Sequence, residues 1–119
     1  MTSKTNNDYH EANSGYLHAN PTWHVEDSAW KATQILKLIE RNQLQPESVV
    51  EIGCGAGEIL NQLQQRMADK MIDFSGYEIA PDAFKLAQTR VKDRLQFFQE
   101  DLLQLDKKFD LLLMIDVFE

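Results

Sequence analysis

The sequence predicts an α/β protein with a parallel, doubly wound sheet. Segments with helical periodicity alternate with short apolar segments of strand length through most of the 119 residues. The last of these, residues 111–115, is apolar at every position, which is typical of a strand that helices cover on both faces. Strands and helices alternating at this spacing form parallel sheets with right-handed crossovers. The length allows at most one domain.

The N-terminal part of the chain is predicted to be irregular. Residues 1–20 are polar with little periodicity, and residues 21–26 continue as a short irregular segment. We therefore expect residues 1–27 to form an arm or a lid. Asp27 or Ser28 can then cap a helix. The apolar positions of this helix are Ala32, Ile35, Leu36 and Ile39.

Four strands and two further helices follow. The expected strands are residues 49–52, 72–78, 95–99 and 109–117. The expected helices are residues 57–69, with Leu60, Leu63 and Met67 on one face, and a helix starting at Pro81, with Phe84, Ala87 and Val91 inward. Only a short turn separates the third strand from the fourth.

Composition limits the class of protein. The net charge is −7 and the 12 basic residues are scattered, which disfavours a nucleic acid bound by this segment. No apolar segment is long enough to span a bilayer and no signal-peptide pattern opens the sequence, so we expect a cytoplasmic protein without a membrane partner. Cys54 is the only cysteine, which excludes an internal disulfide framework and a cysteine-rich metal site.

The most informative local feature is the segment that starts at Glu51. This carboxylate lies at the end of an apolar strand, and glycines follow at alternate positions, Gly53, Gly55 and Gly57. Such glycines let the backbone bend tightly and approach a ligand, and the start of the following helix suits anions. A dinucleotide fingerprint needs its third glycine at position 58, where this chain has Glu58. The spacing therefore indicates a different small molecule, or a purely structural turn.

Acidic residues end or follow every predicted strand. They are Glu51, Glu78, Glu100, Asp101 and Asp116. Ligands of doubly wound sheets bind outside the carboxyl ends of the strands, so these acids predict a site at that edge. Glu78 follows Gly53 by 25 positions, close to the spacing at which a carboxylate accepts hydrogen bonds from a ribose diol. The alternative is that Glu78 caps the following helix.

The E-x-G-x-G-x-G pattern of residues 51–57, followed by these acids, resembles the motifs of the class I S-adenosylmethionine-dependent methyltransferases. The resemblance covers about residues 28–119, which would form the S-adenosylmethionine-binding half of such a domain. It implies a Rossmann-like sheet in the order 3-2-1-4-5-7-6, truncated here after the fourth strand, so that only 3-2-1-4 is present. We therefore expect an apolar edge strand and poor solubility or partial unfolding of the chain alone.

The resemblance also assigns cofactor-binding roles. Asp101 would accept from the adenine amino group, Leu102 would offer a backbone N–H and an apolar wall, and Ile79 would pack on the adenine face. Glu51 and Asp116 would serve the methionine end, where carboxylates complement positive charge. Alternatively, Asp101 is an exposed turn acid and Ile79 a core residue. The whole expected set is Glu51, Gly53, Gly55, Gly57, Glu78, Ile79, Asp101, Leu102 and Asp116.

Other candidate residues have simpler interpretations. The three histidines fit no tight chelating geometry, so we expect no metal site; they are His10, His18 and His24. Cys54 has no recognisable activating base and is predicted to be a small packing residue. Asp110 is predicted to act at the start of a strand rather than as a ligand. The aromatic residues expected in the core are Trp30, Phe84, Phe97 and Phe98.

The resemblance implies methyl transfer from S-adenosylmethionine to an unidentified small-molecule or protein acceptor. This chain would carry the cofactor-binding half and be inactive alone, and no catalytic base can be assigned in it. Two alternatives remain: a non-catalytic S-adenosylmethionine-binding module, and a nucleotide-cofactor oxidoreductase.

Overall fold

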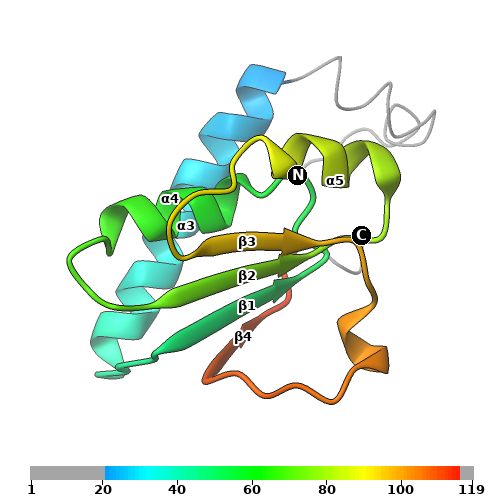
Figure 1. Cartoon of the computed structure of the whole chain (residues 1–119). Helices are drawn as coiled ribbons and strands as arrows, with labels where there is room; N and C mark the ends of the chain where they lie inside the picture. The colour runs from blue at the N-terminus through cyan, green and yellow to red at the C-terminus, as the bar shows by residue number, and fades with distance from the viewer. Residues whose placement is uncertain (1–20, 116–119) are drawn as a thin grey trace.

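A computed structural model describes the backbone of residues 21–115 and the side chains of residues 27–115. Its elements, in chain order, are α3 (Pro21–Arg41), β1 (Ser48–Ile52), α4 (Glu58–Arg66), β2 (Asp73–Tyr77), α5 (Pro81–Gln88), β3 (Leu95–Phe98), the 3-10 helix η1 (Leu102–Gln104) and β4 (Leu111–Leu113). The strands form one parallel sheet in the order β3-β2-β1-β4 (Figure 1). The predicted α/β class and the order 3-2-1-4 are confirmed.

β1 is an interior strand, between β2 and β4, and it carries side chains on both faces of the sheet. Val49 pairs with Phe74 of β2 on one side and with Leu111 of β4 on the other. Side chains alternate along a strand, so Val49 and Glu51 point to one face and Val50 to the opposite face. The loop that follows β1 therefore starts at the middle of the sheet.

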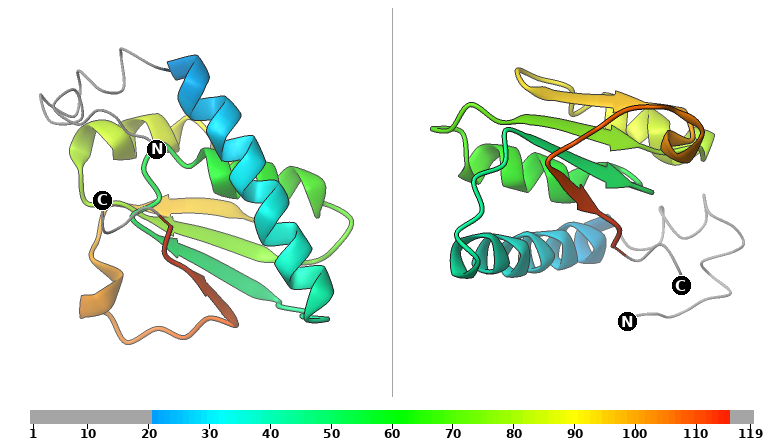
Figure 2. Two further views of the ribbon diagram at one scale, coloured as in Figure 1. Left: turned by 180° about the vertical axis from the view of Figure 1, so that it is seen from behind. Right: turned by 90° about the horizontal axis from the view of Figure 1, so that it is seen from below.

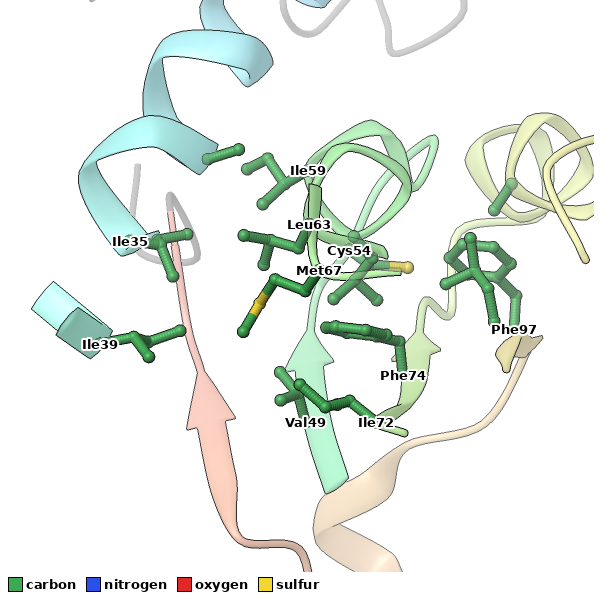
Figure 3. Close-up of a cluster of buried hydrophobic side chains, with 14 residues drawn as sticks. Ile35, Ile39, Val49, Cys54, Ile59, Leu63, Met67, Ile72, Phe74 and Phe97 are labelled. Carbon is green, nitrogen blue, oxygen red and sulfur yellow. The ribbon is translucent and has the colours of Figure 1, made fainter. Parts of the chain in front are cut away.

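The α-helices of the described residues cover one face of the sheet. α3, α4 and α5 lie on the same side (Figures 1 and 2), and their apolar side chains pack with those of the strands into the larger hydrophobic cluster (Figure 3). Its buried members are Ala32, Ile35, Ile39, Val49, Cys54, Ile59, Leu60, Leu63, Met67, Ile72, Phe74, Ala87, Leu95 and Phe97. The inward faces predicted for α3 and α4 are confirmed.

The opposite face is covered by the connection between β3 and β4. Leu102 of η1 packs on Val50 and Tyr77 in a second, smaller buried cluster. Tyr77 also stacks on Phe98, with ring centroids 5.0 Å apart. The chain thus uses a short irregular segment, rather than a helix layer, to bury the centre of this face.

β4 is shorter and more exposed than its sequence suggested. It spans Leu111–Leu113, and it lies at the edge of the described sheet, next to β1. Leu112 is 50% exposed, because its side chain points away from the face that α3, α4 and α5 cover. The expectation that helices cover both faces of this strand is wrong for the described residues.

The start of α3 also corrects the sequence-based prediction. The helix begins at Pro21, so the irregular segment over 21–26 and the cap at Asp27 or Ser28 are wrong. Proline is tolerated in the first turn of a helix, where the N–H has no intrahelical partner. Residues 1–20, which make up most of the expected arm or lid, lie outside the described residues.

Two predicted core positions are on the surface. Trp30 is 63% exposed, because it lies two residues from the buried Ala32 and therefore on the other side of α3. Val91 is 43% exposed, because α5 ends at Gln88, with Thr89 as its C-cap. No helix within residues 21–115 is long and apolar enough to cross a membrane.

Candidate functional site

The glycine loop, residues 53–57, joins β1 to α4 in a conformation that favours glycine. Gly53, Gly55 and Gly57 have φ angles of 70°, 58° and 83°. This left-handed region costs residues with a side chain about 1–2 kcal/mol each. Gly57 is also the N-cap of α4, so the loop delivers the backbone directly to a helix N-terminus.

The end of β2 holds the backbone of the glycine loop. The N–H groups of Gly53 and Cys54 both donate to the carbonyl oxygen of Tyr77, at 2.8 and 3.2 Å. The N–H of Gly55 donates to Oε1 of Glu78 at 2.8 Å. The predicted loop and the predicted ribose acid are therefore in direct contact, although 23 residues separate them in the sequence.

Two glycines of the loop meet different surroundings. A Cβ at Gly57 would lie 2.6 Å from two ring carbons of Phe97 and 3.4 Å from the Cβ of Ala87. A Cβ at Gly55 would have no atom within 4 Å. Gly57 is thus required for packing against α5 and β3, whereas Gly55 leaves open space in which a ligand can approach the backbone.

Gly76 of β2 is a further requirement that the sequence analysis missed. A Cβ there would lie 2.6 Å from a ring carbon of Phe97 and 2.8 Å from Sγ of Cys54. Gly76 pairs in register with Glu51. A glycine in the interior of a strand is a recognised sign of close approach, and that signal was available in the sequence.

Glu78 connects the glycine loop to the start of α5. Its Oε2 accepts from the N–H of Ala80, the N-cap residue of α5, at 2.9 Å. The helix-start role considered as an alternative is therefore present together with the contact to the loop. Ile79 beside it is 67% exposed, so the interpretation of Ile79 as a core residue is wrong. Their cofactor roles stay predictions.

The carboxyl end of β3 lies next to that of β2. Nε2 of Gln99 donates to the carbonyl oxygen of Ile79 at 3.3 Å, which joins the two strand ends. Asp101 is exposed, and its Oδ1 accepts from the N–H of Leu103 at 3.0 Å, so it caps η1 as a turn acid. Leu102 is buried. The adenine contacts expected of this pair stay predictions.

Glu51 and Cys54 lie beneath the loop. Glu51 is 2% exposed, on the face of β1 that the helices cover, and Cys54 is 8% exposed within the larger cluster. Burial raises the pKa of the Cys54 thiol, and the carboxylates of Glu51 and Glu78 raise it further. The thiolate is therefore disfavoured at neutral pH, and the prediction of a packing role for Cys54 is confirmed.

A partly buried ion pair between Arg90 and Glu58 was not visible in the sequence. Nε of Arg90 lies 2.6 Å from Oε1 of Glu58, the first residue of α4. Burial alone would raise the pKa of Glu58, but hydrogen bonds from Gln62 and Arg90 and the charge of Arg90 outweigh it and lower the pKa. No local spacing rule connects residues 32 positions apart.

The remaining candidates lie elsewhere. Oδ2 of Asp110 accepts from the N–H of Glu47 at 2.7 Å, at the amino end of the sheet, which confirms its role at the start of a strand. Asp116 lies outside the described residues, as do the side chains of all three histidines. Within residues 27–115, no three His, Cys, Asp or Glu side chains are placed to hold a metal ion.

Similar proteins were found both by sequence and by structure. A family model described as a methyltransferase domain matches residues 23–119. The plantazolicin methyltransferase BpumL, in complex with a triazolic desmethylPZN analog and SAH, is 20% identical with a TM-score of 0.62, over 86% of this chain and 39% of that chain. Magnesium protoporphyrin IX methyltransferase (ChlM) from Synechocystis PCC 6803 with bound SAM is 22% identical with a TM-score of 0.60, over 75% of this chain and 44% of that chain.

These structural likenesses concern the fold, because the identities are low. The chain spans less than half the length of each of these two solved structures. The family match rests on the sequence and covers the glycine loop, every described strand and the acids at the carboxyl edge. The chain therefore belongs to the methyltransferase domain family.

Proposed function

We propose that this chain binds S-adenosylmethionine and carries the cofactor-binding half of an enzyme that transfers its methyl group to an acceptor. The observation that carries the proposal is the contact between Glu78 and the N–H of Gly55. It brings an acid at the end of β2 to a loop whose three glycines have positive φ. Family membership and the SAM and SAH in the similar structures support the same cofactor.

The residues present fit such a cofactor. The open space at Gly55 lets a ligand approach the backbone beside a carboxylate acceptor suited to a ribose diol. In the proposed site, Glu78 would accept from the ribose hydroxyls, and Asp101 and Leu102 would receive the adenine. Ile79, already exposed, would cover one face of the base. Glu51 and Asp116 would complement positive charge at the methionine end.

S-adenosylmethionine supplies a methyl group that its sulfonium already makes electrophilic. The chain's own residues therefore have to bind and orient rather than activate. The glycine loop fixes the backbone, and Glu78 fixes the ribose against it. A general base for the acceptor would come from residues other than those assigned here.

The acceptor class proposed is a small molecule or a protein. The net charge of −7 and the scattered basic residues disfavour nucleic acid bound by this segment. We propose a cytoplasmic location on the composition and the single cysteine.

Isothermal titration of the full-length protein with S-adenosylhomocysteine tests the proposal. We expect saturable binding of S-adenosylhomocysteine, the product that remains after methyl transfer, and no heat of binding with NADH, which serves as the control for a nucleotide-cofactor oxidoreductase. Binding of NADH without binding of S-adenosylhomocysteine would overturn the assignment.

A further inference from the structure

Arg90, like Glu78, contacts the backbone of the glycine loop. It follows the C-cap of α5, and its Nη1 donates to the carbonyl oxygen of Ala56 in the loop at 3.2 Å and to that of Leu86 at 3.3 Å. Its Nε donates to Oε1 of Glu58 at 2.6 Å. One guanidinium thus joins the end of α5, the loop and the first turn of α4.

Glu58 accepts a hydrogen bond from this guanidinium in a largely buried position. Its side chain is 9% exposed, and Nε2 of Gln62 donates to its other oxygen at 2.8 Å. A buried carboxylate needs such partners, because leaving it unpaired costs several kcal/mol. The acid also lies at the positive end of the α4 dipole, which favours its charged form. The pair therefore fixes the orientation of the first turn of α4.

The contacts of Arg90 and Glu78 lie on either side of the peptide group between Gly55 and Ala56. Glu78 holds the N–H of Gly55, and Arg90 holds the carbonyl oxygen of Ala56. The peptide group between Gly55 and Ala56 lies between these two anchored peptide groups, and the open space is at Gly55. Its orientation decides which backbone group a ligand meets there.

We propose that Arg90, paired with Glu58, is a positioning residue that holds the glycine loop in the conformation that binds the cofactor. This inference rests on the proposed function for its ligand. Arg90 itself acts through the loop. A planar guanidinium serves two acceptors in fixed directions at once, whereas a lysine ammonium offers only a point charge on a flexible stem.

A second arginine provides a matched control. Nη1 of Arg94 lies 2.7 Å from Oδ1 of Asp73, in an ion pair that joins the amino ends of β2 and β3. It is therefore also an arginine–carboxylate pair between two elements, but it lies at the amino end of the sheet, away from the loop. Arg94→Gln removes the same charge as Arg90→Gln.

The experiment measures S-adenosylhomocysteine affinity by calorimetry for the wild type, Arg90→Gln and Arg94→Gln, at a temperature well below every melting transition. We expect Arg90→Gln to weaken binding about tenfold, about 1.4 kcal/mol, and Arg94→Gln to change it less than about twofold. Arg90→Lys should recover only part of the loss. A merely structural role would lower the melting temperature of Arg90→Gln and leave the affinity of the folded protein unchanged.

A second measurement needs no ligand. The N–H of Gly57 donates to the carbonyl oxygen of Cys54 at 3.0 Å within the loop. Amide hydrogen exchange at Gly57 should be faster in Arg90→Gln than in the wild type, and unchanged in Arg94→Gln. If Arg90→Gln does not fold, Glu58→Gln, which keeps the side-chain size, takes its place in both measurements.

The outcomes separate the two proposals. A wild-type chain that does not bind S-adenosylhomocysteine overturns the proposed function, while the Gly57 exchange rates still decide whether Arg90 orders the loop. Wild-type binding with equal affinity in Arg90→Gln, or in Glu58→Gln where that variant replaces it, overturns the positioning role and leaves the proposed function intact.

Discussion

The two ends of the sheet use the same chemistry for different purposes. At the amino end, Oδ2 of Asp110 accepts from the N–H of Glu47, and Oγ of Ser48 accepts from the N–H of Asp110. At the carboxyl end, Glu78 accepts from the N–H groups of Gly55 and Ala80. At each end a carboxylate from one segment holds the backbone of another.

The ends differ in what surrounds these carboxylates. The amino-end contacts fix where β1 and β4 begin, and no glycine takes part in them. The carboxyl-end contact involves Gly55, which has a positive φ and open space where a Cβ would be. A carboxylate bound to backbone is therefore a poor indicator of a ligand site by itself. The glycine conformation and the space beside it distinguish the cofactor end from the structural end.

The largest expected effect is on stability, at Gly57, where the glycine loop packs against Phe97. Gly57→Ala places a Cβ 2.6 Å from the ring of Phe97 at a φ of 83°, so we expect it to lower the free energy of unfolding by about 3 kcal/mol. Gly55→Ala meets no atom within 4 Å and should cost only the backbone strain, about 1 kcal/mol. Urea denaturation measures both values. Equal losses of unfolding free energy in the two variants would contradict the assignment of a packing role to Gly57 and of ligand access to Gly55.

The next effect compares the two carboxylates directly. Glu78→Ala should weaken binding of S-adenosylhomocysteine about tenfold, because it removes the proposed acceptor for the ribose hydroxyls. Asp110→Ala should lower the free energy of unfolding by about 1 kcal/mol, because it leaves the Glu47 N–H without its acceptor, and should leave the affinity unchanged. Calorimetric titration and urea denaturation of both variants check this. If Asp110→Ala lost affinity and Glu78→Ala did not, the cofactor site would lie at the amino end of the sheet, and the assignment to the carboxyl end would be wrong.

The smallest effect concerns the pH dependence of the carboxyl end. The pKa of Glu58 is lower in the folded protein than its ordinary value of 4.5. A carboxyl of this kind stabilises the fold above its unfolded-state pKa, and the contribution is lost as the pH falls through the folded-state pKa. The difference in unfolding free energy between the wild type and Glu58→Gln should therefore be about 1 kcal/mol or less at neutral pH and shrink below about pH 4.5.

Denaturation curves between pH 3 and pH 7 measure this difference. Asp82→Asn is the control, because Asp82 also lies in the first turn of a helix but is exposed. Its difference from the wild type at neutral pH should be smaller than that of Glu58→Gln. A gap between the wild type and Glu58→Gln that widens toward acid pH would contradict the lowered pKa.

The parts of the site that could be predicted from the sequence are those with short-range signals. The glycines at 53, 55 and 57 predicted a tight turn of the backbone after the first strand, and all three have positive φ in the structure. Glu78 was identified because a strand end has a fixed place in a parallel sheet. Arg90 could not be identified, because its pairing with Glu58 depends on how α5 lies against α4.

The misplaced elements have the same explanation. Trp30 is apolar and within a helix, but the side of α3 that faces the sheet is fixed by Ala32, Ile35 and Ile39 together. An exposed Leu112 could not be told from a buried one, because burial at that strand depends on which layers cover it. Periodicity determines which residues share a face, and packing determines whether that face is covered.

The sequence by itself determined the α/β class, the order of strands and helices, the glycine loop and the acids at the ends of the strands. These features follow from local backbone preferences and from alternation along the chain, which need no distant partner. Only the tertiary structure decided that Glu78 contacts Gly55, that Gly57 and Gly76 make room for Phe97, and that Arg90 reaches Ala56. Each of these joins residues from different elements, and a contact between elements exists only after they have packed.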